Sequence, residues 1–168
     1  MANVNKRRGK YFEDKIAEDY RSILHLDKTQ CYRSGSSGAR TSIEYNGDIS
    51  FSDPEKYPIV TECKYYKSMI LDHFFPVCQS YIDKWIEQVL EEQSHYYNKF
   101  NKEPLTIIIA GKPYDKNYHV LLINYYNLHH SHKSSFIKLY SNVQKSYFIL
   151  LNYSEIENLI TEFLNFTN

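Results

Sequence analysis

Apolar residues recur every three or four positions in three segments of the chain, which is the spacing of an amphipathic helix. The first segment runs from about Lys10 to Leu26, and the second from about Gln79 to Asn101. The third follows Ser154-x-x-Glu157, the pattern of a helix-capping box. Each predicted helix would bury one face. In the second helix that face comprises Ile82, Trp85, Ile86, Val89, Tyr96, Tyr97 and Phe100.

Shorter apolar segments, bounded by turn-forming residues, predict β-strands between these helices. They lie at about 30–33, 47–52, 57–64, 105–110, 118–124 and 147–151. The stretch 125–146 has no periodicity that assigns it to a helix or a strand. Because helices separate the groups of strands, we expect one mixed α/β domain over residues 1–168.

The composition indicates a globular protein without a strong overall charge. Of 168 residues, 42% are hydrophobic, and the formal net charge is zero. Three cysteines without CxxC spacing support neither a disulfide framework nor a zinc knuckle. With no visible signal peptide or bilayer-spanning run, we expect a cytoplasmic protein with no membrane partner. The many Asn, Tyr, Ile and Lys residues indicate an AT-rich genome such as a bacteriophage's, which would mean the host cytoplasm.

An acid followed by an acid-x-Lys element is the main chemical feature of the sequence. Asp48 lies fourteen residues before Glu62, which ends an apolar run and precedes Cys63 and Lys64. Side chains alternate across a strand, so Glu62 and Lys64 would share one face. Two carboxylates suit a hard divalent cation, and a nearby ammonium suits phosphodiester hydrolysis. Two acids and a lysine can also fall at this spacing by chance on surface strands.

Two further polar residues border predicted apolar stripes. Glu13 shares a helix face with Ile16 and Tyr20, so its carboxylate either reaches the sheet edge or is a solvated flank charge. Gln93 lies inside the stripe of the second helix, between Val89 and Tyr97. Its amide needs hydrogen-bond partners there. A water, a metal ligand, a phosphate or a backbone carbonyl would each satisfy it.

Basic and small residues offer a local surface for a polyanion. The run Lys6-Arg7-Arg8-Gly9-Lys10 is either such a surface or a solvated tail. The Ser/Gly loop after Arg33 would let the backbone approach a phosphate, with Arg33 or Arg40 to pair with it, or it is a surface loop without a role. The candidate DNA contacts are Arg7, Arg8, Lys10, Arg33, Ser34, Ser36, Ser37 and Arg40.

Together these motifs resemble a known family. Arg8-Gly9-Lys10-x-x-Glu13, Arg33-Ser34-Gly35-Ser36-Ser37-Gly38, Gly47-Asp48-Ile49 and Glu62-Cys63-Lys64 occur in one order. This order resembles the archaeal-type (Hjc-like) Holliday junction resolvases of the PD-(D/E)XK nuclease superfamily, over roughly residues 6–67. Gln93-x-x-x-Tyr97 also looks like the Gln-xxx-Tyr element of RecB-like members. Gly47 stands where the superfamily's name has Pro, and residues from about 118 extend beyond the compact resolvases.

The resemblance implies a restriction-endonuclease-like fold, a mixed β-sheet flanked by α-helices. It implies Mg²⁺ or Mn²⁺ held by Asp48, Glu62 and the Cys63 carbonyl. Lys64 would position water or stabilise developing charge, with Glu13 as an outer ligand. Gln93 would be a further catalytic residue.

The function expected from this resemblance is metal-dependent cleavage of four-way DNA junctions by two symmetric nicks. A two-fold homodimer on branched double-stranded DNA would be the natural assembly. A restriction-type or recombination-associated RecB-like nuclease is the alternative enzyme. A non-catalytic DNA-binding module is the alternative outside enzymes.

Overall fold

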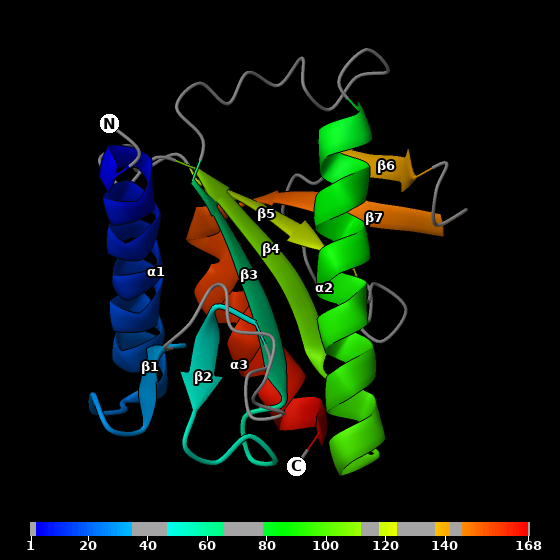
Figure 1. Cartoon of the computed structure of the whole chain (residues 1–168). Coiled ribbons are helices and arrows are strands. Elements are labelled where there is room, and N and C mark those ends of the chain that lie inside the picture. The colour runs from blue at the N-terminus through cyan, green and yellow to red at the C-terminus, as the bar shows by residue number, and fades with distance from the viewer. Residues whose placement is uncertain are drawn as a thin grey trace.

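The computed structural model describes residues 3–34, 47–65, 79–111, 118–123, 137–141 and 146–167. The chain begins with a long helix and ends with another, and most strands lie between them (Figure 1). The elements are α1 (Asn3–Leu24), β1 (Cys31–Arg33), β2 (Ile49–Phe51), β3 (Ile59–Tyr65), α2 (Gln79–Phe100), β4 (Leu105–Gly111), β5 (His119–Leu122), β6 (Ile137–Ser141), β7 (Ser146–Asn152), a 3₁₀ turn (Tyr153–Glu155) and α3 (Ile156–Thr167).

The central sheet has five strands in the order β3-β4-β5-β7-β6. Only β3 and β4 are parallel, with Glu62 opposite Ile108, and the other pairs are antiparallel. The helix α2 makes the crossover between the two parallel strands, as such a connection requires. A separate antiparallel pair, β1 and β2, lies beside β3, and Gly47 bridges to Thr61. We call the edge of β3 that does not pair with β4 its free edge. The two sheets meet at this edge.

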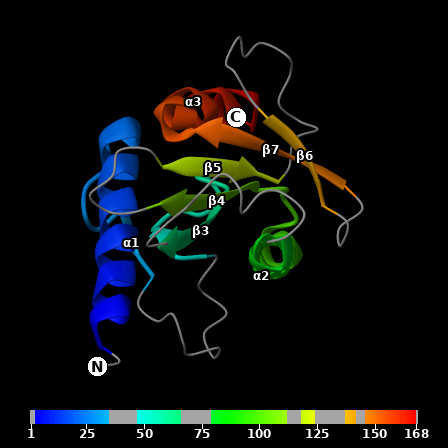
Figure 2. The ribbon, with the colours of Figure 1, turned by 90° about the horizontal axis from the view of Figure 1, so that it is seen from above.

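Helices cover both faces of the sheet, α1 and α3 on one and α2 on the other (Figure 2). Alternation along β3 sorts its side chains between the two layers. Ile59 and Cys63 belong to the core with α1, whereas Val60 belongs to the core with α2. Thr61 also faces α1, because its hydroxyl lies 2.9 Å from that of Tyr20. Glu62 and Lys64 consequently project toward α2.

The structure confirms the predicted α/β class and moves several element boundaries. The first helix begins at Asn3, well before the predicted start near Lys10, because its first turns are polar and lack an apolar stripe. Tyr97 was predicted in the buried stripe of α2 but is 46% exposed. Ser154 was predicted to cap the last helix, but that helix starts after a 3₁₀ turn. The side chain of Asn152 caps this turn by accepting a hydrogen bond from the N–H of Ser154.

Residues after about 118, expected as a C-terminal extension, supply strands β5, β6 and β7 of the same sheet and the helix α3. The strand β6 falls in the stretch that the sequence left without an assignment. Within the described helices, none is long and apolar enough to cross a membrane. The mixed sheet between helical layers is the arrangement of a restriction-endonuclease-like fold.

Candidate active site

Asp48 is fixed against the edge of β3 by two hydrogen bonds. Its N–H donates to the carbonyl of Thr61, and its Oδ2 accepts from the N–H of Cys63, each at 2.8 Å. Gly47 permits this approach. Its φ is +92°, and a Cβ there would lie 2.4 Å from the Thr61 carbonyl oxygen. The backbone just before Asp48 therefore requires glycine.

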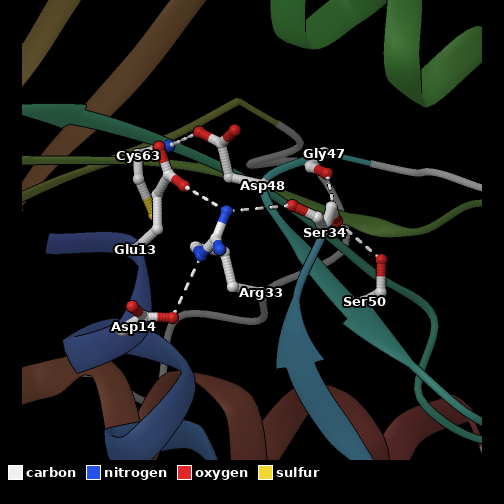
Figure 3. Close-up of polar contacts among 8 residues, drawn as sticks. All are labelled: Glu13, Asp14, Arg33, Ser34, Gly47, Asp48, Ser50 and Cys63. Carbon is white, nitrogen blue, oxygen red and sulfur yellow. Dashed lines mark hydrogen bonds and ion pairs between the residues drawn. The ribbon is translucent and has the colours of Figure 1, made fainter. Parts of the chain in front are cut away.

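Ser34 supports the same segment from the end of β1. Its N–H donates to the Asp48 carbonyl at 2.8 Å, and its hydroxyl donates to the Gly47 carbonyl at 2.7 Å. The hydroxyls of Ser34 and Ser50 are 2.6 Å apart. Ser34 was predicted to contact DNA, but it is buried and its hydroxyl points inward (Figure 3). In this arrangement it holds the Asp48 segment in place.

Glu62 and Lys64 form an ion pair on the face of β3 that α2 covers. The Nζ of Lys64 donates to the Oε1 of Glu62 and, at 2.8 Å, to the Oε1 of Gln88 on α2. The Nε2 of Gln88 donates to the same Glu62 oxygen at 2.7 Å. Both ends of the Gln88 amide are therefore used to orient the acid and the lysine. The prediction that Glu62 and Lys64 share a face is confirmed.

Glu13 and Arg33 lie on the opposite, α1 side of this edge (Figure 3). Glu13 is only 8% exposed, and its Oε2 lies 3.7 Å from Nη1 of Arg33. The Nε of Arg33 donates to Asp14 at 3.0 Å. Glu13 therefore points toward the sheet edge, as one of its two interpretations expected. Arg33 lies between two acids of α1, so part of its charge is already balanced.

Burial and mutual repulsion raise the pKa of three carboxyl groups at this edge. Burial, then the neighbouring Glu62 carboxylate, raises the pKa of Asp48 to about 7. Burial and the charge of Asp48 raise the pKa of Glu13 to about 7. Burial, then Glu62 and Asp48, raises the pKa of Glu92, on α2, to about 9. The acids are thus close enough to repel one another across the edge of β3.

Gln93 lies away from the Glu62–Lys64 ion pair. Its Nε2 donates to the carboxylate of Glu103, which precedes β4, and it is half-buried. Because β3 and β4 are parallel, Glu103 lies at their amino-terminal end, whereas Glu62 pairs with Ile108 farther along. The amide that reaches Glu62 from α2 is that of Gln88. Gln93 finds its partner in a carboxylate, which the sequence interpretation had not considered.

The predicted DNA contacts divide into three groups. Arg7 and Lys10 are exposed on the first half of α1, and Arg8 there is half-buried. Arg33 and Ser34 have the inward contacts given above. The predicted contacts Ser36, Ser37 and Arg40 lie outside the described residues. Contact of any of these residues with DNA stays a prediction.

A divalent cation fits the chemistry of this edge. No group of three or more His, Cys, Asp or Glu side chains placed to hold a metal occurs in the described ranges. Pairs of carboxylates do occur, and Mg²⁺ is commonly bound by one or two carboxylates while it keeps several waters. The Oε2 of Glu62 is buried and has no hydrogen-bond partner among the described residues. An orphaned carboxylate oxygen beside repelling acids is what a bound cation would satisfy.

Gln88 and Glu92 are the residues that the sequence interpretation missed. They lie four residues apart, so they share a face of α2 beside the buried Val89. Gln88 lowers the pKa of Glu92, although burial and the neighbouring acids raise it by more. This i, i+4 spacing was a visible signal. Hydrophobic periodicity alone could not decide whether Gln88 or Gln93 faces β3.

Fold and site together define a class, the PD-(D/E)XK-type nucleases, with an acid at the edge of a strand that carries Glu-x-Lys. A family model described as "Phage putative PDDEXK endonuclease" matches residues 4–167, and the chain belongs to this family. Neither curated proteins nor solved structures gave a match. The superfamily prediction is confirmed, and nucleases of this class generally depend on divalent metals. The match does not extend to the Hjc-like type.

Proposed function

We propose that this nuclease is a metal-dependent DNA endonuclease that cuts branched DNA. The observation that carries the proposal is the meeting of Asp48, Glu62 and Lys64 at the free edge of β3, where the buried Oε2 of Glu62 has no hydrogen-bond partner in the part of the chain that the structure describes. Structural acids are ordinarily paired when buried. An unpaired carboxylate oxygen beside a second acid suits a cation-dependent reaction.

Asp48 and Glu62 would hold Mg²⁺ or Mn²⁺, with the Cys63 carbonyl as a further oxygen ligand and Glu13 outside them. When bound, such a cation polarises the phosphate and lowers the pKa of water. Asp48 contributes a carboxylate whose direction is set by the Cys63 N–H. Lys64 places a positive charge beside Glu62, where negative charge on a phosphate would develop, and Gln88 holds that ammonium in place.

The exposed basic residues of α1 would bind the DNA backbone. Lys6, Arg7 and Lys10 are exposed on the helix that also carries Glu13, so DNA on this surface would lie beside the acids. Such phosphate contacts weaken steeply with salt. Preference for a four-way junction is supported by the order of the motifs around Glu13, Arg33 and Asp48. Two symmetric nicks need two sites, which a two-fold homodimer would supply.

The direct test offers the protein a four-way junction, a flap and a linear duplex of matched sequence, with and without Mg²⁺. We expect paired symmetric cuts confined to the junction and dependent on the metal. Glu91→Gln, a change at an exposed position of α2, is the control for handling and folding. Equal cutting of linear duplex would overturn the branched substrate and leave a restriction-type nuclease. Junction binding without cleavage in the presence of Mg²⁺ would overturn the nuclease proposal.

A further inference from the structure

One face of the β1–β2 pair leads from the acidic site to an exposed aromatic residue. Successive side chains of a strand point to opposite faces of the sheet. Cys31 belongs to the core with α1, and Arg33 lies 3.7 Å from Glu13 of that helix. The residues that alternate with them, Tyr32 and Ser34, therefore face away from α1.

The pairing of the two strands places Asp48 on this same face. Tyr32 pairs with Ser50 across the strands, and the N–H of Ser34 donates to the Asp48 carbonyl at 2.8 Å. The hydroxyls of Ser34 and Ser50 lie 2.6 Å apart, so both project to one side (Figure 3). Two residues of a strand span about 7 Å. Tyr32 is thus about two residues along the strand from the level of Asp48.

Tyr32 differs from the other members of this row in its exposure. It is 39% exposed, whereas Ser34 and Ser50 are buried. Its strand is held firmly, because Nη1 of Arg21 on α1 donates to the Cys31 carbonyl at 2.9 Å and β2 pairs with the other side. A tyrosine has few rotatable bonds, so on such a strand it loses little conformational entropy when it binds a flat ligand.

Nucleobases are the flat ligands that this position would meet. Glu62 and Lys64 also project away from α1, so DNA bound at Asp48 would extend over the same side of the molecule. A distance of about 7 Å is the rise of about two base pairs of duplex DNA. Inside a continuous duplex, neighbouring pairs cover both faces of each base. At a branch the stack is interrupted, and a base face becomes available to an aromatic ring.

We propose that Tyr32 stacks on a base exposed at the branch point, within about two nucleotides of the phosphate at Asp48. Stacking tolerates every base, so this contact would select DNA by its shape and not by its sequence. The inference rests on the proposed function and deepens it. It names a residue that favours branched over continuous DNA.

The first test measures DNA affinity in chelator, where bound DNA stays intact, on a four-way junction and on linear duplex. We expect Tyr32→Ala to weaken junction binding by about 5- to 150-fold and to leave duplex binding unchanged. Tyr32→Phe keeps the ring and should bind as the wild type does. Tyr140→Ala is the matched control, since Tyr140 is an exposed tyrosine on β6, at the opposite edge of the central sheet.

A fluorescent base analogue gives a second readout. The fluorescence of 2-aminopurine at the branch falls when the base stacks on an aromatic ring. We expect this fall with the wild type and with Tyr32→Phe, and its loss with Tyr32→Ala. Melting curves verify that each variant is folded. The wild-type signal needs no variant, so it tests the proposal even if Tyr32→Ala is destabilised.

Unchanged junction affinity in folded Tyr32→Ala would overturn the stacking role. An equal loss on junction and duplex would overturn it too, because the residue would then act on all DNA alike. So would a wild type that leaves 2-aminopurine fluorescence unchanged at every branch position. The proposed function fails differently, through absent metal-dependent cleavage by a wild type whose Tyr32 signals are as expected. The two failures are therefore distinguishable.

Discussion

The acids on the two faces of β3 differ in the partners that the protein gives them. On the α1 side, Arg33 pairs with Glu13 and Asp14, so these buried or bordering carboxylates have a cationic partner. On the α2 side, Lys64 is bonded to one oxygen of Glu62, while an oxygen of Glu62 and one of Glu92 have no hydrogen-bond partner among the described residues. On the α1 side, Arg33 partly offsets the charge of the acids. On the α2 side, Lys64 reaches only one oxygen of Glu62, and we attribute the unpartnered oxygen to metal binding.

The largest effect is expected from removing Glu62, the acid that the proposed metal site shares with Lys64 and Gln88. Glu62→Gln should reduce cleavage to background and abolish Mn²⁺ binding, because the neutral amide removes a ligand charge while little surface changes. DNA binding should persist. Cleavage of a labelled junction and a gel-shift assay measure the two effects. Cleavage at the wild-type rate would remove Glu62 from the site.

Lys64→Ala tests whether the ammonium group beside Glu62 acts in the reaction. Loss of a charge that stabilises the transition state should slow turnover by about 10²–10³-fold. Mn²⁺ affinity should change little. Single-turnover cleavage at saturating metal measures the rate, with Lys84→Ala, at an exposed position of α2, as the control. Full activity in Lys64→Ala would dismiss its catalytic role.

Gly47→Ala tests the backbone geometry that brings Asp48 to β3. The positive φ alone costs about 1–3 kcal/mol for a residue with a side chain. The added Cβ would also lie 2.4 Å from the Thr61 carbonyl oxygen. We expect the melting temperature to fall by about 5–10 °C and Mn²⁺ affinity to fall with it. A variant that melts and binds as the wild type does would show that this glycine is dispensable.

The mildest test changes no residue and follows the pH dependence of stability. The pKa values of Asp48 and Glu13 are raised to about 7 in the fold, and that of Glu92 to about 9. Because each folded pKa lies above its ordinary value, ionisation disfavours the fold. The metal-free protein should therefore lose stability as the pH rises from about 4 to about 9.

Thermal melts in chelator across this pH range measure the loss. Glu92→Gln should flatten the curve above pH 7, where, of the three acids, Glu92 is the one whose raised pKa still contributes. Added Mn²⁺ should restore stability most at high pH, since it binds the ionised carboxylates. A metal-free protein that becomes more stable toward pH 9 would contradict the repulsion between these acids.

Much of this site could be predicted from local sequence patterns. Alternation along β3 places Glu62 and Lys64 on one face, and the spacing from Asp48 suits an adjacent strand. Glu13 was identified by its place beside an apolar stripe. These features depend on one element at a time, so a single sequence contains them.

What the sequence could not supply depends on how two elements rotate against each other. Periodicity predicted α2 and placed Gln93 inside its buried stripe, but the amide that reaches Glu62 on β3 is that of Gln88. The inward role of Ser34 depends on β1 meeting the backbone at Gly47, a contact between distant segments. The strand β6 had no visible pattern, because its assignment comes from pairing with β7.

The central claim is that Asp48 and Glu62 bind a divalent cation at the free edge of β3. The most direct measurement is an anomalous difference map from crystals of the wild-type protein grown with Mn²⁺. We predict a peak within coordination distance of a carboxylate oxygen of Asp48 and one of Glu62. A well-ordered site with no peak between these two acids at saturating Mn²⁺ would contradict the account.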